Sequence, residues 1–232
     1  MFTDKNKQLA NWLNQFLLAN FVIALLISLR YLTPHPLPEK LDAGIFLACY
    51  FIAHLGLFAL ILLVTIRLIT RTITRPLVKR IIGIALVSLA IALLLADTFV
   101  YQQYRFHLNT MVLELIIAGG NEILTFSWQL WRQIILIVIV FFLLQGAMSE
   151  YLWHKLAHRQ IRIKAIVATW AVIFFSASII NIWADAVFRK DITRQAFYLP
   201  LSYPLTAKSL IASLGLLDLA AYKQQSLLAP DK

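Results

Sequence analysis

The chain has 232 residues, of which 61% are hydrophobic and 14% are charged. Soluble domains average about 45–50% apolar and about 25% charged residues, so this composition excludes a water-soluble globule. Seven Gly and seven Pro exclude a collagen-like or low-complexity chain. The single cysteine, Cys49, excludes an intramolecular disulfide and a multi-thiolate metal centre. The class of protein that fits this composition is an integral membrane protein. Its net charge is +10, and the positions of the basic residues along the chain are more informative than the total.

Five apolar stretches are long enough to cross a bilayer. A helix needs about 20 apolar residues for this, because its backbone polar groups must find partners inside the segment. The stretches are residues 12–31, 43–66, 77–101, 130–148 and 163–184. No small-residue cleavage site follows the first stretch, so we expect an uncleaved anchor. The sequence therefore predicts an all-α, polytopic membrane protein with five transmembrane helices.

Basic residues are concentrated before the first stretch and after the second and fourth. These three segments hold eleven Lys and Arg but only Asp4 and Glu150 as acids. Short basic loops stay in the cytoplasm, so we predict a cytoplasmic N-terminus and, after five crossings, an external C-terminus. Aromatic residues near the ends of the stretches suit the interfacial belts; they are Trp12, Tyr31, Trp128, Trp131, Trp170 and Trp183.

The remaining segments are too short or too polar to span. Residues 111–118, which end at Gly119-Gly120, predict a short interfacial or re-entrant helix on the outer face. After residue 188 the composition changes, and two short helices are expected, at 204–214 before Gly215 and from Asp218 to about 228. The predicted domains are a membrane domain, 1–188, and a periplasmic linker, 189–232.

Ionisable groups within or beside a span are costly and invite a functional interpretation. Three of them lie at predicted outer helix ends, where each can reach the headgroups by snorkelling or all can join in one cluster. His54 lies deepest, and we expect a neutral imidazole bonded to Asn181, Gln145 or a backbone carbonyl rather than a proton relay. The candidate interhelix polar cluster is Arg30, His54, Asp97, Asn181 and Asp185.

The loop after the second span is strongly basic, with Arg67, Arg71, Arg75, Lys79 and Arg80. These cations hold the loop in the cytoplasm, and they are also candidates for contact with anionic lipid of that leaflet.

Residues 199–209 carry the strongest binding signal. Prolines and hydroxyl side chains mark a helix start just outside the membrane, where free backbone N–H groups favour an anion. Thr206, Lys208 and Ser209 add side-chain donors, and neighbouring leucines can enter the acyl boundary. A lipid phosphate site and an ordinary interfacial helix both fit this pattern. Elsewhere the sequence offers no catalytic constellation, and it predicts no enzyme, no metal site and no cofactor.

Several segments together carry a family resemblance. They are Arg30-Tyr-Leu32, Arg105-Phe-His-Leu-Asn109, Trp128-Gln-Leu130, Ile182-Trp-Ala-Asp-Ala186, Leu199-Pro-Leu-Ser-Tyr-Pro-Leu-Thr-Ala207 and Gly215-Leu-Leu-Asp218. With these segments in this order and five predicted spans, the sequence resembles the YejM/PbgA (LapC) family of Gram-negative inner-membrane proteins. The resemblance implies a five-helix membrane domain and a linker. The family's periplasmic sulfatase/alkaline-phosphatase-like domain would begin about where this chain ends.

The resemblance also implies a function. The family monitors lipopolysaccharide at the periplasmic leaflet and engages the assembly protein LapB through the membrane domain. LapB otherwise helps the protease FtsH to degrade the deacetylase that commits precursor to lipid A, so release of LapB by excess lipopolysaccharide lowers synthesis. Two alternatives are binding or transport of cardiolipin and the membrane half of a phosphoethanolamine-transferase-like enzyme. The partners expected are thus lipids and LapB in the inner membrane, and not nucleic acid.

The family's lipid A contact matches Thr206, Ala207, Lys208 and Ser209 here. Where an example of the family carries two adjacent arginines, this chain has Lys208 and Ser209, so one charge and the planar bidentate donor are lost. Accessory cations for the lipid phosphate are then expected at Arg189, Lys190 and Arg194.

Overall fold

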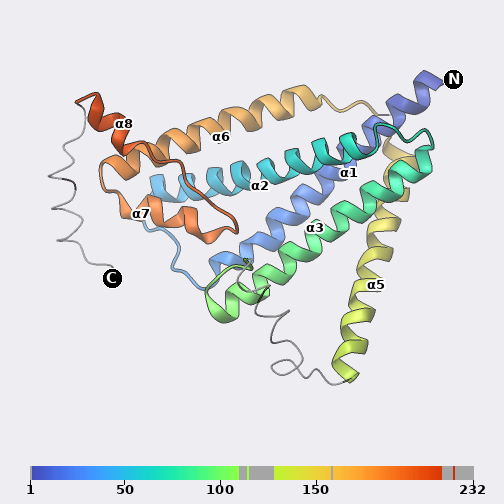
Figure 1. The fold of residues 1–232 in the computed structure, drawn as a ribbon, viewed down its shortest axis with the longest axis horizontal. Coiled ribbons are helices and arrows are strands. Elements are labelled where there is room, and N and C mark those ends of the chain that lie inside the picture. The colour runs from blue at the N-terminus through green and yellow to red at the C-terminus, as the bar shows by residue number, and fades with distance from the viewer. Residues whose placement is uncertain (1, 110–113, 115–127, 158, 216–221, 223–232) are drawn as a thin grey trace. The chain divides into compact units, whose positions relative to one another are not determined.

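The computed structural model describes residues 2–109, 114, 128–157, 159–215 and 222, and all regular structure in these residues is helical (Figure 1). The long helices are α1 (Phe2–Ser28), α2 (Leu41–Ile69), α3 (Pro76–Tyr104), α5 (Trp128–Tyr151) and α6 (Ile163–Ala186). This architecture confirms the predicted fold class, an all-α membrane protein.

Four helical segments of the described chain are long and apolar enough to cross a bilayer: Asn6–Leu32, Leu41–Ile69, Pro76–Tyr104 and Ile163–Ala186. Each contains one of the predicted spans. Helix α5 has 24 residues and covers the remaining prediction, 130–148; at 1.5 Å per residue it is about 36 Å long. That α5 crosses the bilayer, that the chain has five transmembrane helices, and that its N-terminus is cytoplasmic stay predictions.

Short helical segments extend or connect the long ones. They are η1 (Leu29–Leu32), the π-helix η2 (Leu152–Leu156), α7 (Lys190–Thr193), η3 (Arg194–Tyr198) and α8 (Lys208–Ser213). Helix α8 corresponds to the helix predicted at 204–214, but it begins later because residues 202–207 are not helical. Apart from single residues, the helices predicted at 111–118 and 218–228 lie outside the described residues.

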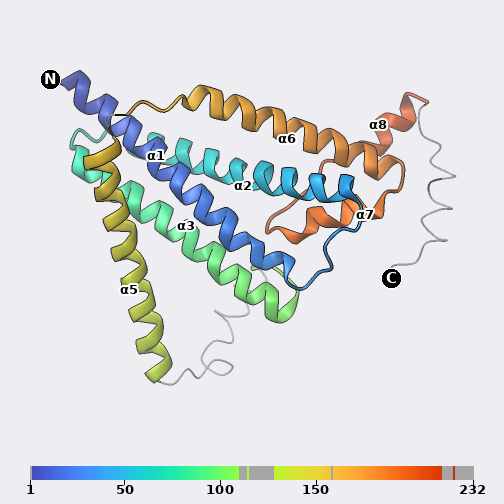
Figure 2. The same ribbon diagram turned by 180° about the vertical axis from the view of Figure 1, so that it is seen from behind.

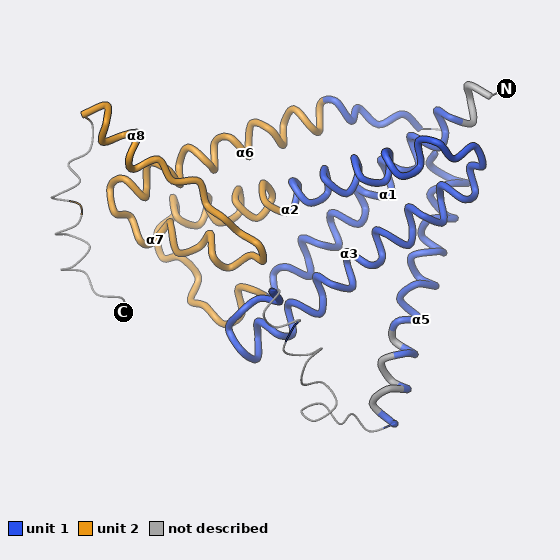
Figure 3. The backbone as a smooth tube through the Cα atoms, in the orientation of Figure 1, with its two compact units in different colours: residues 1–30, 55–164 blue, residues 31–54, 165–232 orange. Residues whose placement is uncertain are grey.

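The chain forms two compact units (Figure 3). Unit 1 comprises Met1–Arg30 and Leu55–Lys164, and unit 2 comprises Tyr31–His54 and Ala165–Lys232. The boundary falls inside α2, after His54. It does not coincide with the predicted division at residue 188, which concerned membrane topology and stays a prediction.

In unit 1, α1 lies alongside α3, as the view from behind shows (Figure 2). The buried core of this unit is formed by Trp12, Leu13, Phe16, Leu17, Leu63, Ile66, Val87, Ile91, Leu152 and Ala157. Trp12 is only 1% exposed, and its indole Nε1 donates to the backbone carbonyl of Ser149 at 3.2 Å. The prediction that Trp12 belongs to an interfacial belt is therefore wrong, because the ring fills the core and its N–H has an internal partner.

Polar side chains join the helices of unit 1. Gln145 of α5 donates to Asn20 of α1 at 2.8 Å, and Arg67 of α2 donates to Asn14 of α1 at 3.0 Å. Without a hydrophobic driving force between helices in lipid, such bonds and close packing hold a bundle together.

Close packing is tightest where α3 passes Trp12. A Cβ atom at Gly83 would lie 3.2 Å from the Trp12 ring. The ring cannot easily move, since it is buried, hydrogen-bonded and stacked on Phe16 at 5.3 Å. Gly83 thus permits the approach of α1 and α3.

We predict that Gly83→Val destabilises the protein by about 1–3 kcal/mol, because the added methyl groups overpack the Trp12 site. Thermal unfolding in detergent, followed by near-UV circular dichroism, measures this change. Gly146→Ala in α5 controls for replacement of a helical glycine, since no described heavy atom outside the neighbouring residues and the helix's own backbone lies within 4 Å of the Cβ position there. Equal midpoints for the two variants would contradict the packing argument.

Candidate functional site

After α6 the chain folds back along unit 2 as a tail hairpin, defined here as residues 189–207 (Figure 1). Its tip, residues 200–202, contacts α2. Nε2 of His54 lies 2.8 Å from the Pro200 carbonyl oxygen, and the Tyr50 and Ser202 hydroxyl groups lie 2.7 Å apart. The partner of His54 is thus a backbone carbonyl, one of the three predicted alternatives.

The tip of the hairpin lies deep along α2. His54 is twelve residues beyond Asp42, or about 18 Å along the helix axis, whereas half of the hydrocarbon layer is about 15 Å thick. Pro200 therefore lies beside the apolar middle of a span. The location of residues 199–209 relative to the membrane surface stays a prediction. Backbone without regular structure is tolerated at such depth where protein satisfies it, and His54 provides one such bond.

The returning limb of the hairpin is fixed to α6. Nδ2 of Asn181 donates to the Leu205 carbonyl at 3.1 Å, and Nζ of Lys208 lies 2.9 Å from Oδ1 of Asp185. Asn181 and Asp185 are four residues apart and hence on one face of α6. This face therefore carries the end of the hairpin and the start of α8.

At the start of the hairpin, a charged network joins it to the first residues of α2. Arg189 lies 2.8 Å from both Asp42 and Asp191, and Lys40 lies 3.4 Å from Asp191. Hydrogen bonds from Arg189, with the charges of Arg189 and Lys40, lower the pKa of Asp191 to about 2 against a partial cost of burial. The same bonds to Asp191 and Asp42 raise the pKa of Arg189. The accessory phosphate contact predicted for Arg189 thus falls on a side chain engaged by two carboxylates.

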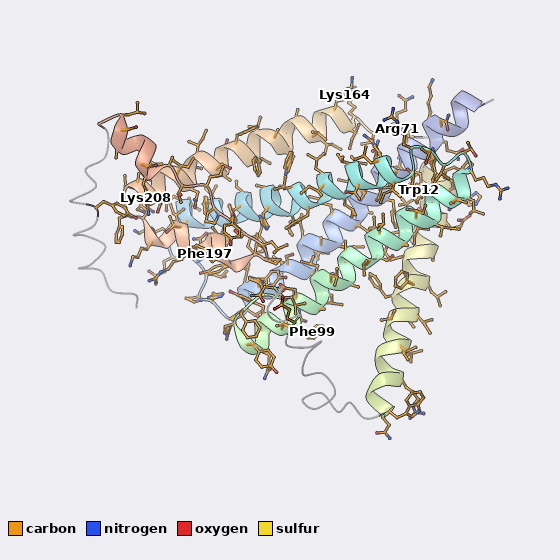
Figure 4. The ribbon with its side chains drawn as sticks, in the orientation of Figure 1. Trp12, Arg71, Phe99, Lys164, Phe197 and Lys208 are labelled. Carbon is orange, nitrogen blue, oxygen red and sulfur yellow. The ribbon has the colours of Figure 1, made fainter. Side chains whose placement is uncertain are left out.

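The predicted lipid A residues lie at the outer end of this hairpin. Thr206 and Ser209 are exposed and Ala207 is half-buried. Lys208 (labelled in Figure 4) is paired with Asp185, and its ammonium lies 4.5 Å from the centre of the Tyr222 ring. Partial burial disfavours the charged form of Lys208, but the bonds with Tyr222 and Asp185 prevail and raise its pKa. Lys208 is therefore a cation, held in place by an acid.

The two other predicted accessory cations have different surroundings. Nζ of Lys190 lies 5.0 Å from the centre of the Phe188 ring, and Arg194 is exposed at the start of η3. Contact of Lys190 and Arg194 with a lipid headgroup stays a prediction.

The predicted polar cluster divides between the two units. In unit 1, Arg30 donates to Gln102 and lies 4.3 Å above the Phe99 ring, which Figure 4 labels. Asp97 lies 2.7 Å from Nδ1 of His107 and also accepts the Leu108 amide, so it stabilises the turn after α3.

In unit 2, His54, Asn181 and Asp185 all contact the tail hairpin or the start of α8. The structure thus brings these three together along one segment. One cluster of all five residues stays a prediction.

The basic loop between α2 and α3 is heterogeneous. Arg71 and Arg75 are exposed, Lys79 is half-buried, and Arg67 is exposed but bonded to Asn14. Figure 4 labels Arg71. For these four residues, contact with anionic lipid of the cytoplasmic leaflet stays a prediction.

Arg80 does not fit the headgroup prediction. It is 8% exposed, forms an ion pair with Glu150, and lies 4.5 Å from the Trp153 ring and 5.6 Å from the Trp12 ring. Its charge is already compensated inside unit 1, so it stabilises the packing of α3 against the end of α5.

Sequence reasoning missed the contacts of Tyr50 and of Asp42. A signal for Tyr50 was present, because Phe46, Tyr50 and His54 recur every fourth residue along α2, and their rings stack in the structure. Asp42 gave none, since its partner Arg189 is 147 residues away in the sequence.

Chemically, the end of the hairpin offers one cation, two exposed hydroxyl groups and large exposed apolar side chains at Leu201 and Leu205. This combination suits an amphiphile with a phosphate headgroup. Among the described residues, no group of three or more His, Cys, Asp or Glu could hold a metal ion.

The charged network predicts a pH dependence. The pKa of Asp191 is lower in the folded protein than its ordinary value near 3.8, so its stabilising effect is present above about pH 4 and is lost as the pH falls through about 2. The difference in melting temperature between the natural protein and Asp191→Asn should shrink over this range. A difference that stays constant from pH 6 to pH 2 would contradict the assignment, and Glu39→Gln controls for loss of a nearby exposed acid.

Comparison with known proteins agrees with these observations. The family described as "Domain of unknown function (DUF3413)" matches residues 1–231. The chain is 31% identical over 229 residues to "Inner membrane protein YejM" of Salmonella typhimurium, and equally to that of Salmonella typhi. It is 28% identical over 228 residues to an uncharacterized protein of Haemophilus influenzae.

Each alignment covers 97% of this chain but 38% of the relative, so the chain spans less than half the length of the curated relatives it matches. The match in family and the similarity over nearly the whole chain agree with the apolar helices of the structure. The chain therefore belongs to the DUF3413 family and is a membrane protein of the YejM type.

Proposed function

We propose that this chain is a sensor and regulator of lipopolysaccharide synthesis in the inner membrane, which binds lipid A phosphate through Lys208 at the end of the tail hairpin. The observation that carries the proposal is the position of the Lys208 ammonium, which is paired with Asp185 of α6, in a segment where Thr206 and Ser209 are exposed. A charge-assisted hydrogen bond to phosphate is stronger than a neutral one. The role is binding and signalling, not catalysis.

The proposal includes an orientation. The N-terminus and the basic loop between α2 and α3 lie in the cytoplasm, in keeping with the rule for basic loops. The two ends of the tail hairpin, near Arg189 and Ala207, face the periplasm. Lipid A of the periplasmic leaflet can then place its phosphate at Lys208 and its acyl chains beside Leu201 and Leu205, which are exposed in the structure.

Asp185 sets the strength of this binding. Its carboxylate holds Lys208 at 2.9 Å, so a phosphate must compete with it for the ammonium. With a single lysine where an example of the family has two arginines, the affinity for lipid A depends on that competition. Lys190 and Arg194 are the candidates for additional cationic contacts with the lipid phosphate.

We predict that Lys208→Glu weakens binding of lipid A at least about tenfold, since reversal of one charge-assisted contact costs more than 1.4 kcal/mol. Binding to the detergent-solubilised chain can be followed by native mass spectrometry. Lys164→Glu is the matched control, because it reverses an exposed charge at the opposite end of α6. Equal loss in both variants would indicate bulk electrostatics and would refute the proposed site.

The proposed partner is LapB, bound through the membrane helices and released when lipopolysaccharide is abundant, so that FtsH then degrades the lipid A deacetylase. Exposed apolar faces of the spans, such as Ile135, Leu136 and Leu143 on α5, offer contact area within the bilayer.

We predict that this chain alone retains LapB in a pull-down and that added lipopolysaccharide releases at least about half of it. Lys208→Glu should retain LapB but respond weakly to lipopolysaccharide, because sensing and binding reside in different segments. Failure of the natural chain to retain LapB would refute the partner, whereas release that is unaffected by Lys208→Glu would refute the sensor.

A second candidate function, binding or transport of cardiolipin, is favoured by one observation. Arg71 and Arg75 are exposed between α2 and α3, where about 1 kcal/mol of attraction to anionic lipid is expected for each. Mass spectrometry of lipids that copurify with the chain separates the two functions: abundant cardiolipin without lipid A would favour the second.

A further inference from the structure

Two side-chain oxygens on α6 lack a hydrogen-bond donor. Asn181 uses its Nδ2 for the Leu205 carbonyl, and Asp185 uses its Oδ1 for Lys208. Their other oxygens, Oδ1 of Asn181 and Oδ2 of Asp185, are buried and have no partner in the part of the chain that the structure describes. Asn181 as a whole is 2% exposed and the Asp185 side chain 15%.

These two acceptors belong to one place. Residues four apart in a helix have neighbouring side chains, with Cβ atoms about 5–6 Å apart. The amide of Asn181 cannot be reversed without loss of its bond to Leu205, so its oxygen is fixed on the unsatisfied side. A buried acceptor without a donor is unfavourable. A group with at least two N–H or O–H donors would satisfy both oxygens together.

The charges next to this pair restrict the group further. A phosphate that takes the Lys208 ammonium leaves the Asp185 carboxylate without its cation, and an uncompensated buried charge is strongly unfavourable. A headgroup that carries its own ammonium avoids this cost. Its phosphate replaces Asp185 at Lys208, and its ammonium replaces Lys208 at Asp185, so the net charge of the site does not change.

We propose that Asn181, Asp185 and Lys208 form a subsite for a phosphoethanolamine headgroup, in which the primary ammonium donates to Asn181 Oδ1 and Asp185 Oδ2 while the phosphate contacts Lys208. The proposal shares Lys208 with the lipid A site and rests on that part of the proposed function. It adds that the zwitterionic phospholipid of the leaflet competes with lipid A for the same lysine. The site would then respond to the ratio of the two lipids and not to lipid A alone.

The test compares phosphatidylethanolamine with phosphatidylcholine of the same acyl chains. The two share phosphate, net charge and apolar area, but the quaternary ammonium of phosphatidylcholine has no N–H to donate. Binding of each to the whole chain in detergent is measured by native mass spectrometry. We expect phosphatidylethanolamine to bind at least about tenfold more tightly, the ratio that corresponds to 1.4 kcal/mol.

Two variants examine the acceptors. Asp185→Asn keeps the size of the side chain and removes its charge, and Asn181→Leu removes the amide oxygen; each should bring the ratio of affinities to within about twofold. Ser178→Ala is the matched control on α6, because the Ser178 hydroxyl already has the Phe174 carbonyl as its partner. Far-UV circular dichroism confirms that each variant is folded.

Equal affinity of the natural chain for the two lipids would overturn the subsite and would mean that water satisfies the oxygens. A preference that survives in both Asp185→Asn and Asn181→Leu would overturn the assignment to these residues. Lipid A binding is measured on the same samples, and it should persist or increase in Asp185→Asn, where the competing carboxylate is gone. A natural chain that prefers phosphatidylethanolamine but binds no lipid A would refute the proposed function and leave the subsite standing.

Discussion

Satisfaction of backbone carbonyls by side chains of the spans is the constraint on which this structure depends. Hydrocarbon offers no hydrogen-bond partner, so backbone that leaves regular helix near a span must be bonded by protein. His54 and Asn181 supply these bonds for the tail hairpin, at Pro200 and Leu205. In unit 1, Gln15 does the same for the carbonyls of Leu156 and Arg159 at the end of the π-helix, at 2.7 and 3.0 Å. His54, Asn181 and Gln15 thus have a common task.

The same constraint connects fold to binding. Because Asn181 holds Leu205, the three residues that follow emerge at the end of α6, and Lys208 reaches Asp185. The position of Lys208, the proposed phosphate ligand, is therefore set by the Asn181 amide, about one helical turn before Asp185 on α6, as well as by the short helix α8 that carries the lysine. A cation positioned in this way loses little conformational entropy when a headgroup arrives.

The sequence allowed the spans to be predicted closely, because their length and hydrophobicity are local properties. Leu41–Ile69, for example, contains the predicted residues 43–66 with only a few more at each end. The tail hairpin could not be predicted, since the contacts that fix it to α2 join residues far apart in the chain, as for Tyr50 with Ser202 and Arg189 with Asp42. Hydropathy predicts whether a segment leaves water for lipid. It does not predict which distant segment will supply the partner of a polar side chain.

Local rules also misassigned two side chains for one reason. Trp12 and Arg80 lie near predicted helix ends, where an aromatic ring or a cation usually meets headgroups. In the structure they contact each other within unit 1, with Glu150 neutralising the guanidinium. A terminal position thus indicates lipid contact only where no neighbouring helix covers it.

The prolines of the tail hairpin have a consequence for its solvation. Pro200 and Pro204 flank the segment that passes beside the apolar middle of α2, and a proline nitrogen carries no hydrogen. Two amide donors that lipid would leave unsatisfied are therefore missing by chemistry, and only carbonyls remain to be accommodated. In a soluble protein these two prolines would only begin or end a helix. Here they lower the cost of removing non-helical backbone from water beside the middle of α2.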